Sequence, residues 1–74
     1  MRLSRKDRIN EIHQDLHALY GLYMNTHQIA KELRVDDRKV KQIMEGALAV
    51  KDGRQIKYRT RIVAQRLADR EVIA

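Results

Sequence analysis

Apolar residues recur every three or four positions between residues 5 and 20, and this spacing predicts a helix with one buried face. The positions are Ile9, Ile12, Leu16, Leu19 and Tyr20. Ser4 is a favourable N-cap, and Asp7 suits the positive end of the helix. Gly21 is a favourable residue for the C-terminal end of this helix. We expect this stripe to pack on the two helices predicted between residues 26 and 45, or to form a seam with a second copy of the chain.

A second helix is predicted from about residue 26. Asn25 or Thr26 can cap it, and Gln28 stands where a capping box that starts at Asn25 requires it. Its expected buried positions are Ile29, Ala30 and Leu33.

The pattern breaks at 34–36, and Asp36 or Asp37 can cap a third helix that Gly46 ends. The expected buried face of this helix is Val40, Ile43 and Met44.

Residues 47–59 change to the period of strands and flank Asp52-Gly53, a hairpin signal. A three-residue loop over 51–53 with a left-handed Gly53 would place Leu48 opposite Ile56 and keep the apolar side chains on one face. We prefer this register to a two-residue loop. A last helix is expected over 60–71, capped by Thr60. The sequence of residues 1–74 therefore predicts a single domain that is mainly α-helical and carries a small β-hairpin.

Composition narrows the class of protein. The 74 residues carry no cysteine, and 16 Lys and Arg give a formal net charge of +6. This charge is typical of nucleic-acid binders. The only aromatic residues are three tyrosines, which argues against a single-strand binder that stacks bases on aromatic platforms.

No apolar run is long enough to cross a membrane, and no apolar stretch follows the basic N-terminus. We therefore expect no secretory signal, no membrane partner and a cytoplasmic location.

The segment 26–45 resembles the helix-turn-helix family, because two short helices meet through a tight turn with a small residue, Ala30, at their crossing. The turn usually carries glycine, whereas this chain has Arg34, which requires a strained backbone or another turn. With the hairpin at 47–59 and the last helix, residues 26 to about 70 resemble the winged-helix modules of phage and transposon excisionases, related to the MerR-type fold.

The resemblance implies sequence-specific binding to duplex DNA, with the second helix in the major groove and the wing at the backbone or minor groove. Members of the family bend DNA and steer a recombinase, and several are repressors. We therefore expect an excisionase or a small transcriptional regulator of a phage or mobile element. The helix at 5–20 departs from the shortest excisionases and would suit a repressor or a dimer equally well.

The resemblance assigns three groups of DNA-contacting residues. The recognition helix contributes Asp37, Arg38, Lys39, Lys41, Gln42 and Glu45. The wing and its flank contribute Lys51, Arg54, Lys57, Arg59 and Arg61. The start of the two-helix segment contributes Thr26 and His27. Arg38 can read guanine and Gln42 adenine, whereas lysines hold phosphates without specifying sequence.

Other readings stay open beside this one. His13 and His17 have the spacing of a metal pair, but no third ligand is evident, so we expect surface histidines and no metal. Asp36 and Asp37 fit capping better than acid–base chemistry. We expect no enzyme activity and no cofactor. The main alternative is an adaptor that docks on a polymerase or recombinase, and an RNA-binding role is third.

Overall fold

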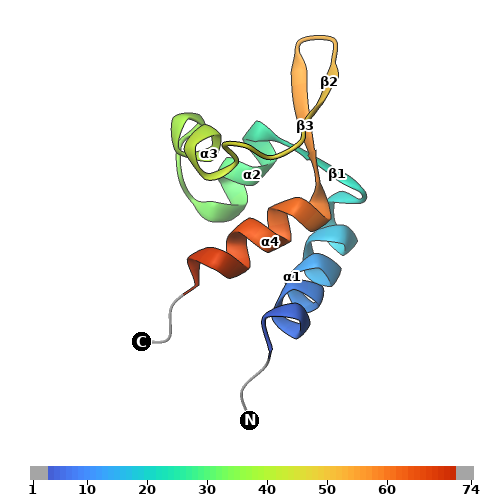
Figure 1. The fold of residues 1–74 in the computed structure, drawn as a ribbon. Helices are drawn as coiled ribbons and strands as arrows, with labels where there is room; N and C mark the ends of the chain where they lie inside the picture. The colour runs from blue at the N-terminus through green and yellow to red at the C-terminus, as the bar shows by residue number, and fades with distance from the viewer. Residues whose placement is uncertain (1–3, 72–74) are drawn as a thin grey trace.

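The computed structural model describes residues 4–71, which form four helices and a three-stranded antiparallel sheet (Figure 1). In chain order the elements are α1 (Arg5–Tyr20), β1 (Tyr23–Asn25), α2 (Thr26–Leu33), α3 (Asp37–Ile43), β2 (Val50–Asp52), β3 (Gln55–Arg59) and α4 (Thr60–Arg70). The expectation of a mainly helical chain with a small hairpin is confirmed. The strand β1 is new, because three residues are too few for a period of two to be recognised.

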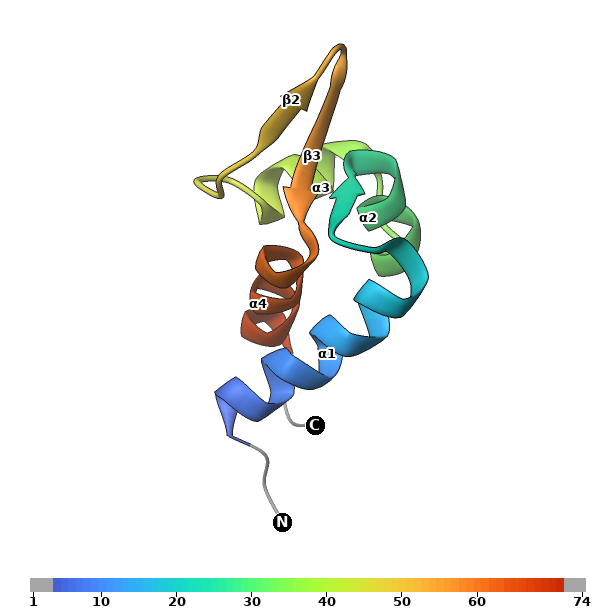
Figure 2. The same ribbon diagram turned by 90° about the vertical axis from the view of Figure 1, so that its right-hand side faces the viewer.

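Helices α1 and α4 lie antiparallel and pack along much of their length (Figures 1 and 2). Ser4 caps α1 by accepting a hydrogen bond from the Asp7 amide, as expected. The apolar stripe of α1 is buried at Ile9, Ile12 and Leu16, but mainly against α4 and not, as expected, mainly against the helices of the 26–45 segment. Because these three side chains are used inside the chain, they cannot also form a dimer seam. Leu19 was wrongly expected in this stripe: it is 67% exposed.

Helices α2 and α3 are joined by the three residues 34–36. Asn25 and Gln28 form the capping box expected at the start of α2, with reciprocal hydrogen bonds of 2.8 and 3.0 Å. Arg34 has a φ of 57°, and its own amide and that of Val35 donate to the carbonyls of Lys31 and Ala30. This is the Schellman closure, which satisfies the last carbonyls of a helix through one left-handed residue. Arg34 therefore takes the conformation in which glycine is usual.

The start of α3 is fixed by Asp36, whose carboxylate accepts from the Lys39 amide at 2.8 Å. The helix ends at Ile43, and Gly46, with a φ of 81°, lies in the turn beyond it. Glu45 is consequently outside α3, so its assignment to this helix was wrong. The end comes early because the chain turns at 44–46 toward the hairpin.

The sheet has the strand order β1-β3-β2, and its register corrects the expected hairpin. Val50 pairs with Lys57 and Asp52 with Gln55, which leaves the two-residue loop Gly53-Arg54. Gly53 alone has a positive φ in this loop, the pattern of a type II′ turn. The predicted three-residue loop was wrong because the prediction assumed that the Leu48 side chain is buried, whereas Leu48 is 83% exposed.

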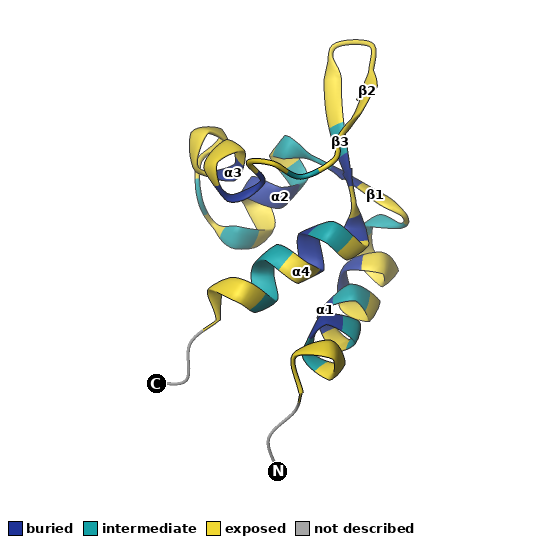
Figure 3. Ribbon diagram, in the orientation of Figure 1, coloured by how far each residue is buried: buried dark blue, intermediate teal, exposed yellow. Residues whose placement is uncertain are grey.

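The buried end of β3 fixes the sheet instead. Tyr58 is buried opposite Met24 of β1, which is fully enclosed. The hairpin beyond this pair projects from the body, and its residues are mostly exposed (Figure 3). The start of α4 is also corrected: Thr60 does not cap the helix but is its first residue, fully buried, and its hydroxyl donates to the carbonyl of Gly21 at 2.6 Å.

The core lies where α1, α4, the α2–α3 pair and the sheet meet (Figure 3). Its buried apolar residues are Ile9, Ile12, Leu16, Met24, Ile29, Ala30, Val40, Ile43, Met44, Tyr58, Val63 and Ala64. The expected buried residues of α2 and α3 are among them, except Leu33, which is half-buried at the edge. Within residues 4–71, no helix combines the length and the apolar character needed to cross a bilayer.

Candidate nucleic-acid interface

Helix α3 presents a polar face to solvent because its apolar residues all point inward. Val40 and Ile43 are buried, as is Met44 just beyond the helix. The remaining side chains of α3 are exposed: Asp37, Arg38, Lys39, Lys41 and Gln42. At 100° per residue, Arg38 and Gln42 lie opposite the buried residues, with Lys39 on one flank and Lys41 on the other. The side chains expected to read bases are therefore the most outward ones.

A groove of about 330 Å³ separates α3 from the hairpin. It is lined by Asn25, Thr26, His27, Asp37, Lys41, Arg54, Gln55 and Ile56. One hollow thus unites members of all three expected groups: the start of α2, the recognition helix and the wing. These residues are far apart in the sequence. The pairing of β1 with β3 brings the start of α2 beside the hairpin.

A second hollow runs along the other side of α3. Its lining residues are Val35, Asp36, Arg38, Lys39 and Gln42. The two hollows share no residue, so α3 stands as a ridge between them with Lys41 on the hairpin side and Arg38 on the opposite side. A ridge of this kind is the shape that enters a groove in a partner.

The cations of this surface have no acidic partner among the described residues. The ion pairs of residues 4–71 join Arg5 to Asp69, Arg8 to Glu11 and Glu71, and Lys57 to Asp52. None of them involves Arg38, Lys39, Lys41, Lys51 or Arg54. Their positive charge is therefore available to an anionic partner.

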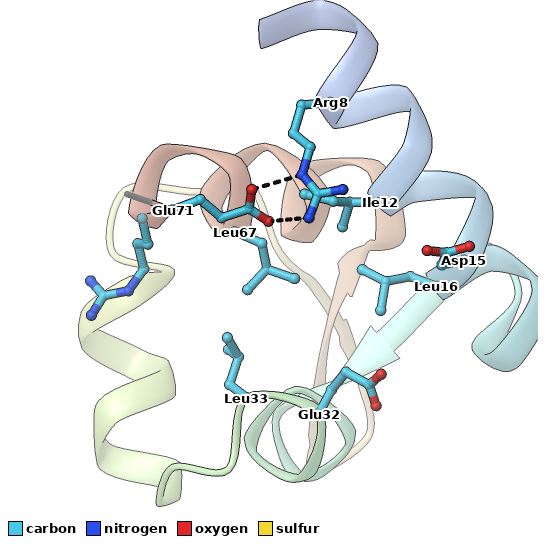
Figure 4. Close-up of a pocket in the computed structure, with 9 residues that line it drawn as sticks. Arg8, Ile12, Asp15, Leu16, Glu32, Leu33, Leu67 and Glu71 are labelled. Atoms are coloured by element: carbon cyan, nitrogen blue, oxygen red, sulfur yellow. Dashed lines mark hydrogen bonds and ion pairs between the residues drawn. The ribbon is translucent and has the colours of Figure 1, made fainter. Parts of the chain in front are cut away.

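Acidic and basic side chains meet at a cleft that includes no residue of α3 or the hairpin. The cleft has a volume of about 400 Å³ and lies between α1, α2 and α4, where apolar side chains are joined by Arg8, Asp15, Glu32, Arg70 and Glu71 (Figure 4). Arg8 and Glu71 form a two-bonded pair at 2.7 Å here, and this hydrogen bond lowers the pKa of the Glu71 carboxyl. Tyr20 of α1 donates to Glu32 of α2 at 2.8 Å, which raises the pKa of the tyrosine. These contacts hold α1, α2 and α4 together.

Not every expected contact residue lies on the α3–hairpin surface. Lys57 is half-buried and bonded to Asp52 at 3.1 Å. Arg61 donates to Asn10 of α1 at 3.2 Å, and Arg59 is close enough to α1 to affect the charge of His13. Arg59 and Arg61 therefore lie beside α1 and line neither hollow of α3.

Three residues of the groove were not expected: Asn25, Gln55 and Ile56. Asn25 had been considered only as a cap, and it fulfils that role. Gln55 and Ile56 follow the hairpin loop, so a correct register would have placed them beside Arg54. Lys51 is paired with Ile56 and lies on the same face of the hairpin.

Within residues 4–71, no set of three His, Cys, Asp or Glu side chains is arranged to hold a metal ion. His13 and His17 stack edge to face with ring centroids 5.7 Å apart. No protein-family model, curated protein sequence or solved structure matches the chain, so its function must be inferred from its own residues.

Proposed function

We propose that α2, the 34–36 turn and α3 act as a helix-turn-helix, that the β2–β3 hairpin is its wing, and that the protein binds duplex DNA in a sequence-specific manner. The observation that supports this most directly is the exposed α3 ridge, whose cations are unpaired within residues 4–71 and which faces the hairpin across a groove.

The dimensions of α3 favour this partner. An α-helix with its side chains is about 10–12 Å across, and the major groove of B-DNA is about 12 Å wide. With α3 in the major groove, the hairpin would reach the neighbouring backbone or minor groove. The cations on both elements would then meet phosphates on either side of the inserted helix.

The roles of the side chains follow from their positions. Arg38 and Gln42 occupy the crest of α3, where a bidentate contact to guanine or adenine is possible. Lys39 and Lys41 flank the crest and Arg54 stands on the hairpin, so these three suit phosphates, which position the protein without specifying sequence. Thr26 and His27 begin α2 in the same groove as Arg54 and would meet the same backbone.

The biological role that fits such a module is the one implied by the resemblance to excisionases: a recombination directionality factor or a small transcriptional regulator of a phage or mobile element. It requires no catalytic group and no cofactor from this chain.

The decisive experiment selects duplexes from a random pool and then measures affinity over a salt series. We expect an enriched sequence, with affinity that falls steeply as salt rises because neutralised phosphates release counterions. Replacing Arg38 or Gln42 with Ala should relax base preference at one position. Arg54→Gln should instead weaken binding to all sequences alike.

Lys31→Gln is the matched control, because Lys31 is exposed on α2 and lines neither hollow of α3. Its affinity should stay close to that of the wild type. No enrichment and no salt dependence would refute the proposal. Copurification of a protein without any affinity for DNA would favour the adaptor alternative.

A further inference from the structure

One flank of α1 carries basic or neutral polar side chains and no acid. Its members, spaced by four, three and four positions, are Lys6, Asn10, His13 and His17. This spacing places them in one row along the helix. The acids Glu11 and Asp15 belong to the other flank, and Asp15 lines the cleft between α1, α2 and α4. The row from Lys6 to His17 therefore contains no acid, whereas the other flank combines these acids with Arg8.

Two arginines from other elements lie beside this row of α1 residues. Arg61, in the first turn of α4, donates to the Asn10 side chain at 3.2 Å. Arg59, the last residue of β3, is exposed and lies next to it. Neither arginine forms an ion pair with an acid in the described part of the chain. We define the basic flank as Lys6, His13, His17, Arg59 and Arg61.

The electrostatics of His13 show that these groups act on one another. Its pKa is lowered, first by partial burial and then by Arg61 of α4, His17 of α1 and Arg59 of β3. These are the charged or titratable groups that face it, and none is an acid. The imidazole therefore lies in a positive field that an anion would relieve.

The basic flank is built mainly on α1 and includes no residue of the recognition helix α3. Figures 1 and 2 show α1 and α3 on opposite sides of the molecule. The molecule extends 44 × 22 × 20 Å along its principal axes. Because α1 and α3 lie on opposite sides, a straight duplex docked on α3 would leave α1 facing away from it.

We propose that the basic flank is a second binding surface for the phosphate backbone of duplex DNA, so that one copy of the protein holds two DNA segments. This inference rests on the proposed function, because α3 and the hairpin hold the first segment. The second contact carries no base-reading residue in a protruding element, so it binds without sequence preference.

A polyanion fits this surface better than a small anion does. At neutral pH its positive charges lie on three elements, with Lys6 in the first turn of α1, Arg59 at the end of β3 and Arg61 in the first turn of α4, so one phosphate could not meet them all. Arginine and lysine placed in a row neutralise successive phosphates, and each contact adds to affinity through counterion release.

The experiment is a capture assay. One duplex carrying the selected site is fixed to beads, the protein is added, and a second fluorescent duplex of unrelated sequence is offered. The test variant is Arg59→Gln with Arg61→Gln. The control is Lys31→Gln with Arg70→Gln, which removes the same charge from residues outside the basic flank.

We expect the wild type and the control to capture the second duplex and the test variant to capture about tenfold less. All three should bind the fixed duplex with similar affinity. Capture by the wild type should increase as the pH falls through the lowered pKa of His13, because the protonated imidazole adds charge, and His13→Gln should remove that increase.

The outcomes separate the two proposals. Undiminished capture by the test variant would overturn the second surface, and it would also show that paired copies bridge the duplexes through α3. Binding of polyglutamate to the basic flank without capture of DNA would overturn it in favour of an acidic protein partner. Loss of all binding to the fixed duplex is expected only for variants of α3 or the hairpin. If those variants bind normally, the proposed function itself is wrong.

Discussion

The hydroxyl of Thr60 donates a hydrogen bond of 2.6 Å to the carbonyl oxygen of Gly21, 39 positions earlier in the chain. The Thr60 amide also donates to the neighbouring carbonyl of Leu22 at 2.8 Å. These two bonds tie the start of α4 to the turn between α1 and β1. They thereby orient the α1–α4 pair against the sheet that carries the hairpin.

Thr60→Val should lower the free energy of unfolding by about 1–3 kcal/mol, because the side chain keeps its shape while the carbonyl of Gly21 loses a buried donor. Urea denaturation followed by circular dichroism measures this loss. Thr60→Ser, which keeps the hydroxyl, should be affected less. Equal stability of the Val variant and the wild type would show that the carbonyl finds another donor.

Arg34→Gly should stabilise the protein by about 0.5–1 kcal/mol, since glycine adopts the left-handed conformation of this turn without the steric cost that a Cβ brings. Arg34→Ala is the control, because it removes the same side chain but keeps the Cβ, and it should give no such gain. Thermal unfolding of the two variants in parallel makes the comparison. A gain in both would assign the effect to the arginine side chain instead of the backbone.

Stability should fall in acid partly through Glu71. Its pKa is lowered by the hydrogen bond from Arg8, so the pair contributes above the ordinary pKa of a glutamate and is lost as pH falls through the lowered value. The melting temperature of Glu71→Gln should therefore depend less on pH between 5 and 2.5 than that of the wild type. Because both side chains are partly exposed, the difference should be small and should shrink in high salt. Parallel curves for the two proteins would contradict this contribution.

Lys41→Gln and Arg54→Gln should each reduce the slope of log affinity against log salt by about 0.9, because each removes one phosphate contact. Both residues line the same groove from different elements, so the double variant should lose about twice as much. Fluorescence anisotropy over a salt series measures the slopes. Arg70→Gln serves as the control, since Arg70 lines the cleft between α1, α2 and α4 and neither hollow of α3. An unchanged slope in both single variants would mean that the groove does not face DNA.

The hairpin loop shows how local and global information differ. Asp52-Gly53 correctly signals a turn, but the register depends on how β3 is held. Tyr58 is buried opposite Met24, and this pairing with a strand too short to recognise decides which residues of β3 face the core. The assumption that Leu48 is buried led to the wrong loop length, because apolar residues on a projecting hairpin remain exposed.

What the amino-acid order settled alone was local: where helices start and stop, and which side of each is apolar. Ser4, Asn25 and Asp36 cap helices by bonding to amides three residues on, and such short-range chemistry needs no partner from elsewhere. Only the tertiary structure decided three features: strand β1, the pairing of α1 with α4, and the position of Arg59 and Arg61 beside α1. Each depends on contacts between residues far apart in the chain, and no spacing along a sequence encodes which distant surfaces meet.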